Sequence, residues 1–150
     1  AKGTLDFVGL NYYTHVLVGP ASVSLLKMKF PKRRQEVATE FGYPMYAEGL
    51  RRAIEFLAPL NVPIEITENG VADAEDTLRT EHLRRHLWVL SNAVKDGHDV
   101  RSYHHWSLMD NFEWAEGYSM RFGLYRVDFE SQERTLRPSG EVYKAIVGRR

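Results

Sequence analysis

The sequence contains no cysteine and no excess of either charge. The lack of cysteine excludes a disulfide framework, thiol catalysis and a Cys-ligated zinc site. Lysine plus arginine and aspartate plus glutamate number 20 each, so the formal net charge is zero. This balance argues against a nucleic-acid partner and gives no membrane-surface signal. No apolar run reaches the length of a membrane-spanning helix.

What remains is the composition of an ordinary globular protein, 43% hydrophobic and 27% charged in 150 residues, which suits one domain over residues 1–150. The first four residues, Ala1 to Thr4, lack the basic region, apolar stretch and cleavage site of a signal peptide. The absence of cysteine is compatible with a reducing compartment, and a cytoplasmic location is expected.

Short apolar segments alternate with helical periodicity along the chain. Strands are expected at residues 5–10, 62–67 and 100–106, and a hairpin at 123–129 and 134–136. Helices are expected from about Ala47 until Pro59 ends the first, at 77–95, and from Pro138 with Val142, Ala145 and Ile146 facing inward. Residues 14–46 read as a long irregular loop, in which the basic Lys32-Arg33-Arg34 is interpreted as a solvated stretch.

This order predicts an α/β fold in which parallel strands are joined by crossover helices. Three strands form an incomplete sheet, and its two apolar outer strands would be unpaired edges. A closed eight-stranded barrel needs roughly 250 residues. The sequence therefore predicts a fragment, a split protein or an obligate assembly, whose chain enters abruptly just before a strand.

Polar and aromatic residues gather after each expected strand. They are Asn11-Tyr12-Tyr13 after the first, Thr67-Glu68-Asn69-Gly70 after the second, and His104 to Trp106 with Asp110 to Trp114 after the third. In a parallel α/β barrel the carboxyl ends of the strands form the active-site face. Taken alone, Glu68-Asn69-Gly70 also fits a simple turn, because Asn-Gly is a common turn dipeptide.

Three motifs together resemble glycoside hydrolase family 1, the β-glucosidase family. They are FVGLNYYT at residues 7–14, ITENG at 66–70 and WSLMDNFEWAEGY at 106–118, followed by RFGL at 121–124. The resemblance covers about Asp6 to Ile146. It implies the C-terminal part of a (β/α)8 TIM barrel, namely strands six to eight with their helices.

The resemblance implies a retaining β-glycosidase with Glu68 as the catalytic nucleophile. A carboxylate can attack the anomeric carbon and later leave from the glycosyl-enzyme ester. Tyr13 matches the tyrosine that donates a hydrogen bond to this nucleophile, and Asn11 matches a neighbouring polar residue. For His104 and His105, packing or support is the preferred interpretation over catalysis.

The resemblance also implies half of a sugar-binding subsite. Trp106 matches the indole on which the sugar stacks, and Glu113 matches the carboxylate that binds outer hydroxyls. Trp114 matches an indole N–H donor and Phe122 a wall of the pocket, although plain core packing is the alternative for both. A non-proline cis peptide bond is implied between Trp106 and Ser107.

The carboxylate of Glu113 narrows the expected substrate. It would repel a phosphate group, which favours plain β-glucosides, galactosides or fucosides over 6-phosphorylated sugars. A smaller departure from the family occurs in the loop before the second strand, where Tyr43 replaces the usual tryptophan and Ala47 the usual proline. No metal-ligand spacing occurs, and no cofactor is expected.

One catalytic group is missing. The family's general acid/base lies in an Asn-Glu-Pro motif, which does not occur in this chain, and neither Glu65 nor Glu116 is assigned that role. The leading hypothesis is one half of a split or nicked β-glycosidase, completed by an N-terminal barrel half on a second chain. The alternatives are an isolated or engineered half-barrel that self-associates into a homo-oligomer, and a module that binds sugars without cleaving them.

Overall fold

The computed structural model describes residues 3–16 and 37–148. The basic triplet Lys32-Arg33-Arg34 and most of the loop predicted for residues 14–46 lie outside these ranges.

A three-stranded parallel sheet forms the centre of the described structure. It consists of β1 (Val8–Asn11), β2 (Ile64–Asn69) and β3 (Val100–His105) in the order β1-β2-β3. The predicted parallel pairing is thus confirmed, but β1 and β2 begin and end later than expected. Pairing starts where the N–H of Val8 donates to the carbonyl of Pro63 at 2.8 Å, because proline has no N–H with which to extend the ladder.

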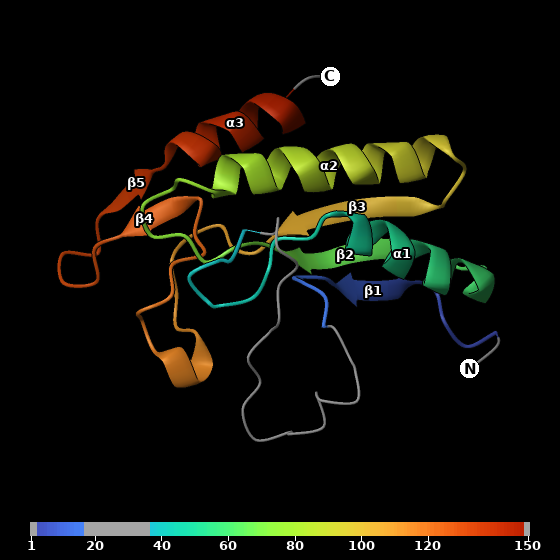
Figure 1. The fold of residues 1–150 in the computed structure, drawn as a ribbon, viewed down its shortest axis with the longest axis horizontal. Coiled ribbons are helices and arrows are strands. Elements are labelled where there is room, and N and C mark those ends of the chain that lie inside the picture. The colour runs from blue at the N-terminus through green and yellow to red at the C-terminus, as the bar shows by residue number, and fades with distance from the viewer. Residues whose placement is uncertain (1–2, 17–36, 149–150) are drawn as a thin grey trace.

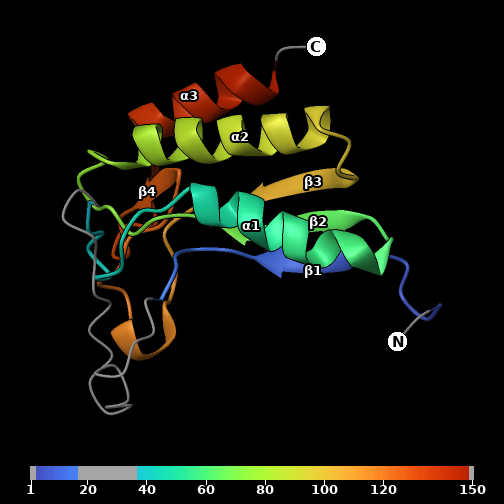
Figure 2. The ribbon, with the colours of Figure 1, turned by 45° about the vertical axis from the view of Figure 1, so that its right-hand side comes forward.

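The three predicted helices are present as α1 (Glu48–Leu57), α2 (Arg79–Lys95) and α3 (Pro138–Val147). Pro59 does not end the first helix abruptly but lies in a 3₁₀ turn, η1 (Ala58–Leu60), that continues it. Figure 1 shows the arrows of the sheet pointing the same way, with α2 between the strands and α3. In Figure 2, α1 lies alongside α2 and over the strands.

One face of the sheet packs against the helices and makes the core. Ile64 and Ile66 of β2 are fully buried with Leu50 and Ile54 of α1, in a cluster completed by Tyr12, Ala47, Val89 and Ala93. Fully burying such an aliphatic side chain contributes about 1.5–3 kcal/mol. Because side chains alternate across a strand, the other face carries residues such as Gly9 and Asn11, which are exposed.

The expected inward face of α3 is wrong in part. Ala145 and Ile146 are exposed, Ile146 by 40% of its surface, whereas the buried positions of this helix are Ser139 and Gly140. α3 packs mainly against α2, and its Tyr143 also lies 6.0 Å from His105 of β3 between ring centroids. These contacts leave Ala145, Ile146 and Val147 exposed.

The hairpin is confirmed but shorter than predicted. Its strands are β4 (Tyr125–Val127) and β5 (Arg134–Leu136), paired antiparallel. Asp128 ends β4 because its carboxylate accepts the backbone N–H groups of Glu130 and Ser131 at 3.0 and 2.9 Å, which forms the turn. A second 3₁₀ turn, η2 (Trp114–Glu116), lies in the loop that precedes the hairpin.

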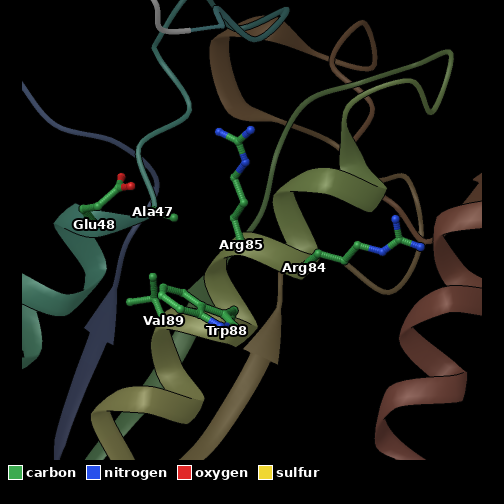
Figure 3. Close-up of a pocket in the computed structure, with 6 residues that line it drawn as sticks. All are labelled: Ala47, Glu48, Arg84, Arg85, Trp88 and Val89. Carbon is green, nitrogen blue, oxygen red and sulfur yellow. The ribbon is translucent and has the colours of Figure 1, made fainter.

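The outer surface is hollowed between α1 and α2. A hollow of about 400 Å³ is lined by Ala47 and Glu48 on one side and by Arg84, Arg85, Trp88 and Val89 on the other (Figure 3). Within the described parts of the chain, none of the helices combines the length and apolar character that crossing a bilayer requires.

Three histidines gather between α2 and β3, of which His82 and His86 are buried and His105 is half-buried. The rings of His82 and His86 stack at 3.9 Å between centroids, and the buried stripe of α2 includes both. Burial lowers the pKa of His86 to about 4 and that of His105 on β3 to about 3, and burial also holds the pKa of His82 well below its usual range. All three are therefore neutral in the folded protein near neutral pH.

We expect acid to destabilise the protein through these histidines. The unfolded chain binds protons near pH 6.5 while the folded chain does not, so stability is complete above pH 6.5 and falls as pH drops towards the folded pKa values. Each histidine contributes up to about 1.4 kcal/mol per pH unit in that window. Urea unfolding between pH 7.5 and 5 measures the slope.

The variant His86→Gln removes one titrating group, so its slope should be shallower than that of the wild type. The matched control is Ser91→Gln, at an exposed position of the same helix that carries no titrating group, which should leave the slope unchanged. Equal slopes in all three proteins would contradict the prediction.

Candidate functional site

The predicted site residues converge at the carboxyl ends of the three strands. The register pairs Asn11 at the end of β1 with Glu68 near the end of β2, and Asn69 with His105 at the end of β3. Trp106 comes directly after His105 in the chain. Because the three strands are parallel, their carboxyl ends lie on the same side of the sheet, as the resemblance to a barrel active-site face requires.

The first polar pair joins β2 to the segment after β1. The phenol of Tyr13 donates a hydrogen bond to Oε2 of Glu68 at 2.7 Å. Burial raises the pKa of Tyr13, and the hydrogen bond to Glu68 and its charge raise that pKa further. The phenol therefore stays protonated across the whole physiological pH range and remains a hydrogen-bond donor to Glu68.

The second polar pair joins β3 to the loop that follows it. The indole Nε1–H of Trp106 donates to Oε1 of Glu113 at 2.9 Å, and only 8% of Glu113 is exposed. Burial raises the pKa of Glu113, and the charge of Glu68 raises it too, whereas the hydrogen bond from Trp106 opposes the rise. The predicted cis peptide bond between Trp106 and Ser107 is present.

The two pairs are held close by a glycine. A Cβ at Gly70 would lie 1.7 Å from the carbonyl oxygen of Trp106, so any other residue would force the two loops apart. The Asn-Gly sequence that on its own fits a simple turn therefore also permits this close backbone approach. It brings the segment after Glu68 against Trp106.

An aromatic wall borders the Tyr13–Glu68 pair. Phe122 lies edge-on to Tyr13 at 6.1 Å between ring centroids, and Tyr43 lies edge-on to it at 6.4 Å. Phe41 contacts both Tyr43 and Phe122, which closes the ring of aromatic contacts. Burial raises the pKa of Tyr43, and the charge of Glu113 raises it further, so this residue lies within electrostatic reach of the site.

The sequence patterns did not place Tyr43 in the site. It comes from the loop before α1, where the backbone N–H and hydroxyl of Thr39 both donate to the Tyr43 carbonyl at 2.9 and 3.0 Å. Neither helical nor strand periodicity marks such a position. Its only signal was its occurrence within the loop that resembles the family.

Two predicted residues lie apart from the pairs. Asn11 accepts a hydrogen bond from the hydroxyl of Thr67 at 2.6 Å and does not bond Glu68. Trp114 is 84% exposed at the start of η2. The roles of both remain predictions. His105 is half-buried and its ring lies 6.0 Å from that of Tyr143 between centroids, in agreement with a packing role, while His104 is exposed.

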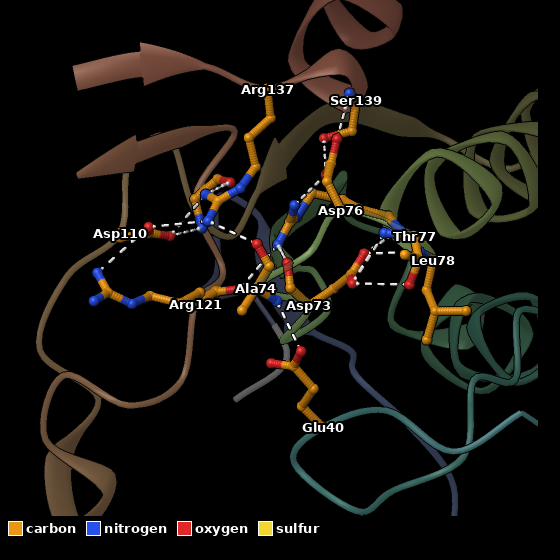
Figure 4. A network of polar contacts seen from close by, with 12 residues as sticks. Glu40, Asp73, Ala74, Asp76, Thr77, Leu78, Asp110, Arg121, Arg137 and Ser139 are labelled. Atoms are coloured by element: carbon orange, nitrogen blue, oxygen red, sulfur yellow. Dashed lines mark hydrogen bonds and ion pairs between the residues drawn. The ribbon is translucent and has the colours of Figure 1, made fainter. Parts of the chain in front are cut away.

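Behind the site, Asp73 fixes the loop that follows β2. Its carboxylate accepts the backbone N–H groups of Thr77, Leu78 and Arg79 at 3.1, 2.7 and 2.8 Å, which satisfies the free donors at the start of α2 (Figure 4). The guanidinium of Arg79 in turn donates to the carbonyls of Asp73 and Arg121 at 2.6 and 2.8 Å.

Asp110 and Arg137 connect the remaining loops. The two Nη groups of Arg137 donate to the Asp110 carboxylate at 3.0 and 3.2 Å, and both side chains are buried. The same carboxylate accepts the N–H of Gly123 at 2.9 Å, and Arg137 also donates to the carbonyl of Ala74 at 3.3 Å. The loop after β2, the loop after β3 and the start of α3 are thereby tied together (Figure 4).

The side chains at the carboxyl ends of the strands offer carboxylates and uncharged hydrogen-bond donors. Across residues 3–16 and 37–148, no cluster of three or more His, Cys, Asp or Glu side chains is arranged to hold a metal ion. Glu65 lies on the sheet face away from the core, paired in register with Gly9 and Ser102, and Glu116 lies exposed in η2. One carboxylate that accepts from a phenol and a second that accepts from an indole N–H suit the binding and attack of a sugar.

Comparison with known proteins identifies the same family throughout. The model of Glycosyl hydrolase family 1 matches residues 1–150. A β-galactosidase of Saccharolobus solfataricus is 39% identical, with 97% of this chain aligned to 32% of that protein. A β-glucosidase of Agrobacterium sp. is 39% identical, with 95% of this chain aligned to 34% of it.

Solved structures that resemble this chain are β-glucosidases as well. The hyperthermophilic β-glucosidase of Pyrococcus furiosus matches with a TM-score of 0.88 and 44% identity over 97% of this chain and 33% of that one. The same values apply to a β-glucosidase mutant derived from a hyperthermophilic tetrameric structure. The chain thus spans about a third of the length of these relatives.

The buried Asp110–Arg137 pair should be a large contributor to stability. Asp110→Ala leaves the guanidinium of Arg137 buried and uncompensated, and breaking such a pair costs about 3–5 kcal/mol of unfolding free energy. Urea unfolding of the purified variant measures the loss. The matched control is Asp99→Ala, which breaks the exposed Asp99–Arg101 pair at 2.9 Å and should shift the midpoint far less. Equal shifts for the two variants would contradict the prediction.

Proposed function

The chain belongs to glycosyl hydrolase family 1, and we propose that it provides the nucleophile and half of the sugar-binding surface of a retaining β-glycosidase. Its strands β1, β2 and β3 are proposed to be strands six, seven and eight of the barrel. The observation that carries the proposal is the hydrogen bond from Tyr13 to Glu68, beside the hydrogen bond from Trp106 to Glu113.

Glu68 is proposed to be the nucleophile. Its carboxylate oxygen forms a bond to the anomeric carbon while the bond to the leaving oxygen breaks, which gives a glycosyl-enzyme ester. Water then attacks the same carbon and releases the sugar and the carboxylate. Tyr13 supports this role because its protonated phenol can donate to the carboxylate before attack and after release.

Trp106 and Glu113 are proposed to bind the outer sugar. The indole face suits the C–H surface of the ring, and the carboxylate accepts hydrogen bonds from hydroxyls. The Nε1–H of Trp106 holds the Glu113 carboxylate in one orientation for that purpose. Because a carboxylate repels phosphate, an unphosphorylated β-glucoside, galactoside or fucoside is the proposed substrate. Phe122 is proposed to form the wall of the sugar pocket beside Tyr13. Trp114 and Asn11 are also proposed to contact the sugar.

Turnover is proposed to belong to the complete barrel. A retaining glycosidase needs a second carboxyl group about 5–5.5 Å from the nucleophile, to protonate the leaving oxygen and then activate water. The Asn-Glu-Pro motif that carries it in the family is absent from this sequence. The remaining part of the barrel, in a longer chain or a second one, is proposed to supply it and to cover the exposed sheet face. Because one similar structure derives from a tetrameric β-glucosidase, a homo-oligomer is also proposed.

The nucleophile assignment predicts which mixture is active. The chain alone should not hydrolyse an activated aryl β-glucoside, whereas the chain mixed with an N-terminal part of a family-1 enzyme should. In that mixture Glu68→Gln should lower kcat by about 10³-fold or more, since the covalent step is lost. The control is Glu75→Gln, an exposed carboxylate in the same loop, which should retain activity. Turnover by the Glu68→Gln mixture at the wild-type rate would refute the assignment.

Tyr13→Phe tests the hydrogen bond separately from the nucleophile. Without the phenol donor the Glu68 carboxylate loses the hydrogen bond that fixes its orientation, so kcat/KM should fall by about tenfold or more. The ring of phenylalanine keeps the edge contact with Phe122, so the fold should be retained. The measurement is aryl β-glucoside hydrolysis by the complete enzyme. A kcat/KM equal to that of the wild type would show that Tyr13 does not act through Glu68.

A further inference from the structure

Asn69 directly follows the proposed nucleophile in the chain, but the proposed function leaves its side chain unused. The residue is fully buried, with 0% of its surface exposed. Burying an amide costs free energy unless its hydrogen bonds are satisfied, so packing alone would favour an apolar residue at this position. The groups that bind the amide therefore indicate what it does.

The amide of Asn69 spans β2 from the segment after β1 to β3. Its Nδ2 donates to the carbonyl of Tyr12 at 2.7 Å, and its Oδ1 accepts from the hydroxyl of Tyr103 at 2.9 Å. A carbonyl can only accept, so the nitrogen of the amide must face Tyr12 and the oxygen must face Tyr103. Both ends of the side chain are thus satisfied, and its orientation is fixed.

The side chain lies where the backbone pairing of the sheet is irregular. The register shifts between Leu10 and Asn11 on one side of β2, and between Ile66 and Asn69 on the other side. Irregularities of this kind redirect side chains near active sites, and they also interrupt the ladder of backbone hydrogen bonds. The two hydrogen bonds of the Asn69 amide join the carboxyl ends of the three strands across this interruption.

Tyr12 is held at both of its backbone polar groups. Its N–H donates to the carbonyl of Glu68 at 2.9 Å, and its carbonyl accepts from Asn69. The next residue in the chain, Tyr13, donates through its phenol to Oε2 of Glu68 at 2.7 Å. These hydrogen bonds and the chain between the four residues form a closed circuit. A turn of the Tyr12 peptide would therefore carry the phenol away from the carboxylate.

The main chain of Asn69 makes a separate contact with the sugar-binding residues. Its carbonyl accepts the backbone N–H of Trp106 at 2.9 Å. A substitution of the side chain leaves this backbone hydrogen bond available. Variants of Asn69 therefore test the contacts of the amide with Tyr12 and Tyr103.

We propose that Asn69 is a positioning residue, whose amide holds the peptide of Tyr12 so that Tyr13 keeps its phenol on the nucleophile. Tyr103 is a second positioning residue, because its hydroxyl fixes the orientation of that amide. The inference rests on the proposed function, since it gives Asn69 a part in presenting Glu68. Its expected effect is large because a displacement of about 1 Å at a reacting group can cost about 10²-fold in rate.

The test is a double-mutant cycle in the complete enzyme. Asn69→Leu removes both hydrogen bonds of the amide at nearly constant size and adds no charge beside Glu68. It should lower kcat/KM for an activated aryl β-glucoside by about tenfold or more. In the Tyr13→Phe background, which already lacks the phenol, the same substitution should lower kcat/KM by less than about threefold. A residue that acts through the phenol has nothing left to position there.

Tyr103→Phe is the milder variant, because it keeps the ring and removes only the hydroxyl that orients the amide. It should lower kcat/KM by about two- to fivefold, and it should have no further effect when combined with Asn69→Leu. The matched control is Ser139→Ala, which removes another fully buried hydrogen bond, from the Ser139 hydroxyl to Asp76 at 2.6 Å. It should lower the midpoint of urea unfolding and leave kcat/KM unchanged in either background.

A merely structural role would make Asn69→Leu equally harmful with and without the phenol. Equal fold losses in the two backgrounds, or a wild-type kcat/KM in Asn69→Leu, would therefore overturn the inference. If Asn69→Leu does not fold, the cycle of Tyr103→Phe with Tyr13→Phe decides the question in the same way. Glu68→Gln tests the proposed function separately, so additive losses in an enzyme that still depends on Glu68 overturn this inference alone.

Discussion

Parallel pairing of β2 with a strand on each side is the constraint on which the site and the core both depend. The register that sets Asn11 opposite Glu68 also brings the carboxyl end of β3, and hence Trp106, close to these two residues. Side chains along a strand alternate between faces, so the same pairing directs Ile64 and Ile66 towards the helices. A slip of one residue would expose the core and turn the site residues away at once. The fold therefore cannot lose its site geometry without losing its core.

The loops beyond the strand ends have no periodic apolar face, and buried ions hold them instead. One carboxylate accepts several N–H groups from different segments, which no aliphatic side chain can do. Asp73 in this way gathers three donors at the start of α2, and Asp110 joins Gly123 to Arg137. Buried charges cost free energy unless they are paired or hydrogen-bonded. Here Asp110 is paired with Arg137, and Asp73 accepts hydrogen bonds from backbone N–H groups. The result is that the segments after Glu68 and after Trp106 keep a fixed separation behind the site.

Periodicity and motifs predict some features of this protein and miss others for physical reasons. Apolar segments and helical periodicity predicted the described strands and the helices α1, α2 and α3, but not the 3₁₀ turns η1 and η2. The family motifs anticipated the residues of both polar pairs, including Tyr13 with Glu68. The inward face assigned to Ile146 failed because burial depends on a neighbouring element that the described chain lacks. The stacked His82 and the aromatic contact of Tyr43 with Tyr13 were missed because tertiary packing alone decides them. Local patterns thus predict elements, whereas contacts between loops require the fold.

The charges of Glu68 and Glu113 constrain the group that the rest of the barrel is proposed to supply. Two carboxylates, Glu68 and Glu113, interact strongly enough that the charge of the first raises the pKa of the second. Their side-chain donors in the described residues are the phenol of Tyr13 and the indole of Trp106, both uncharged. A third carboxyl group entering from the remaining barrel would meet two negative charges, and like charges favour its protonated form. Protonation is the state a general acid needs before it can protonate the leaving oxygen. Under the proposed function, the acidic character of this part of the site would favour the protonated state that the missing acid needs for its first step.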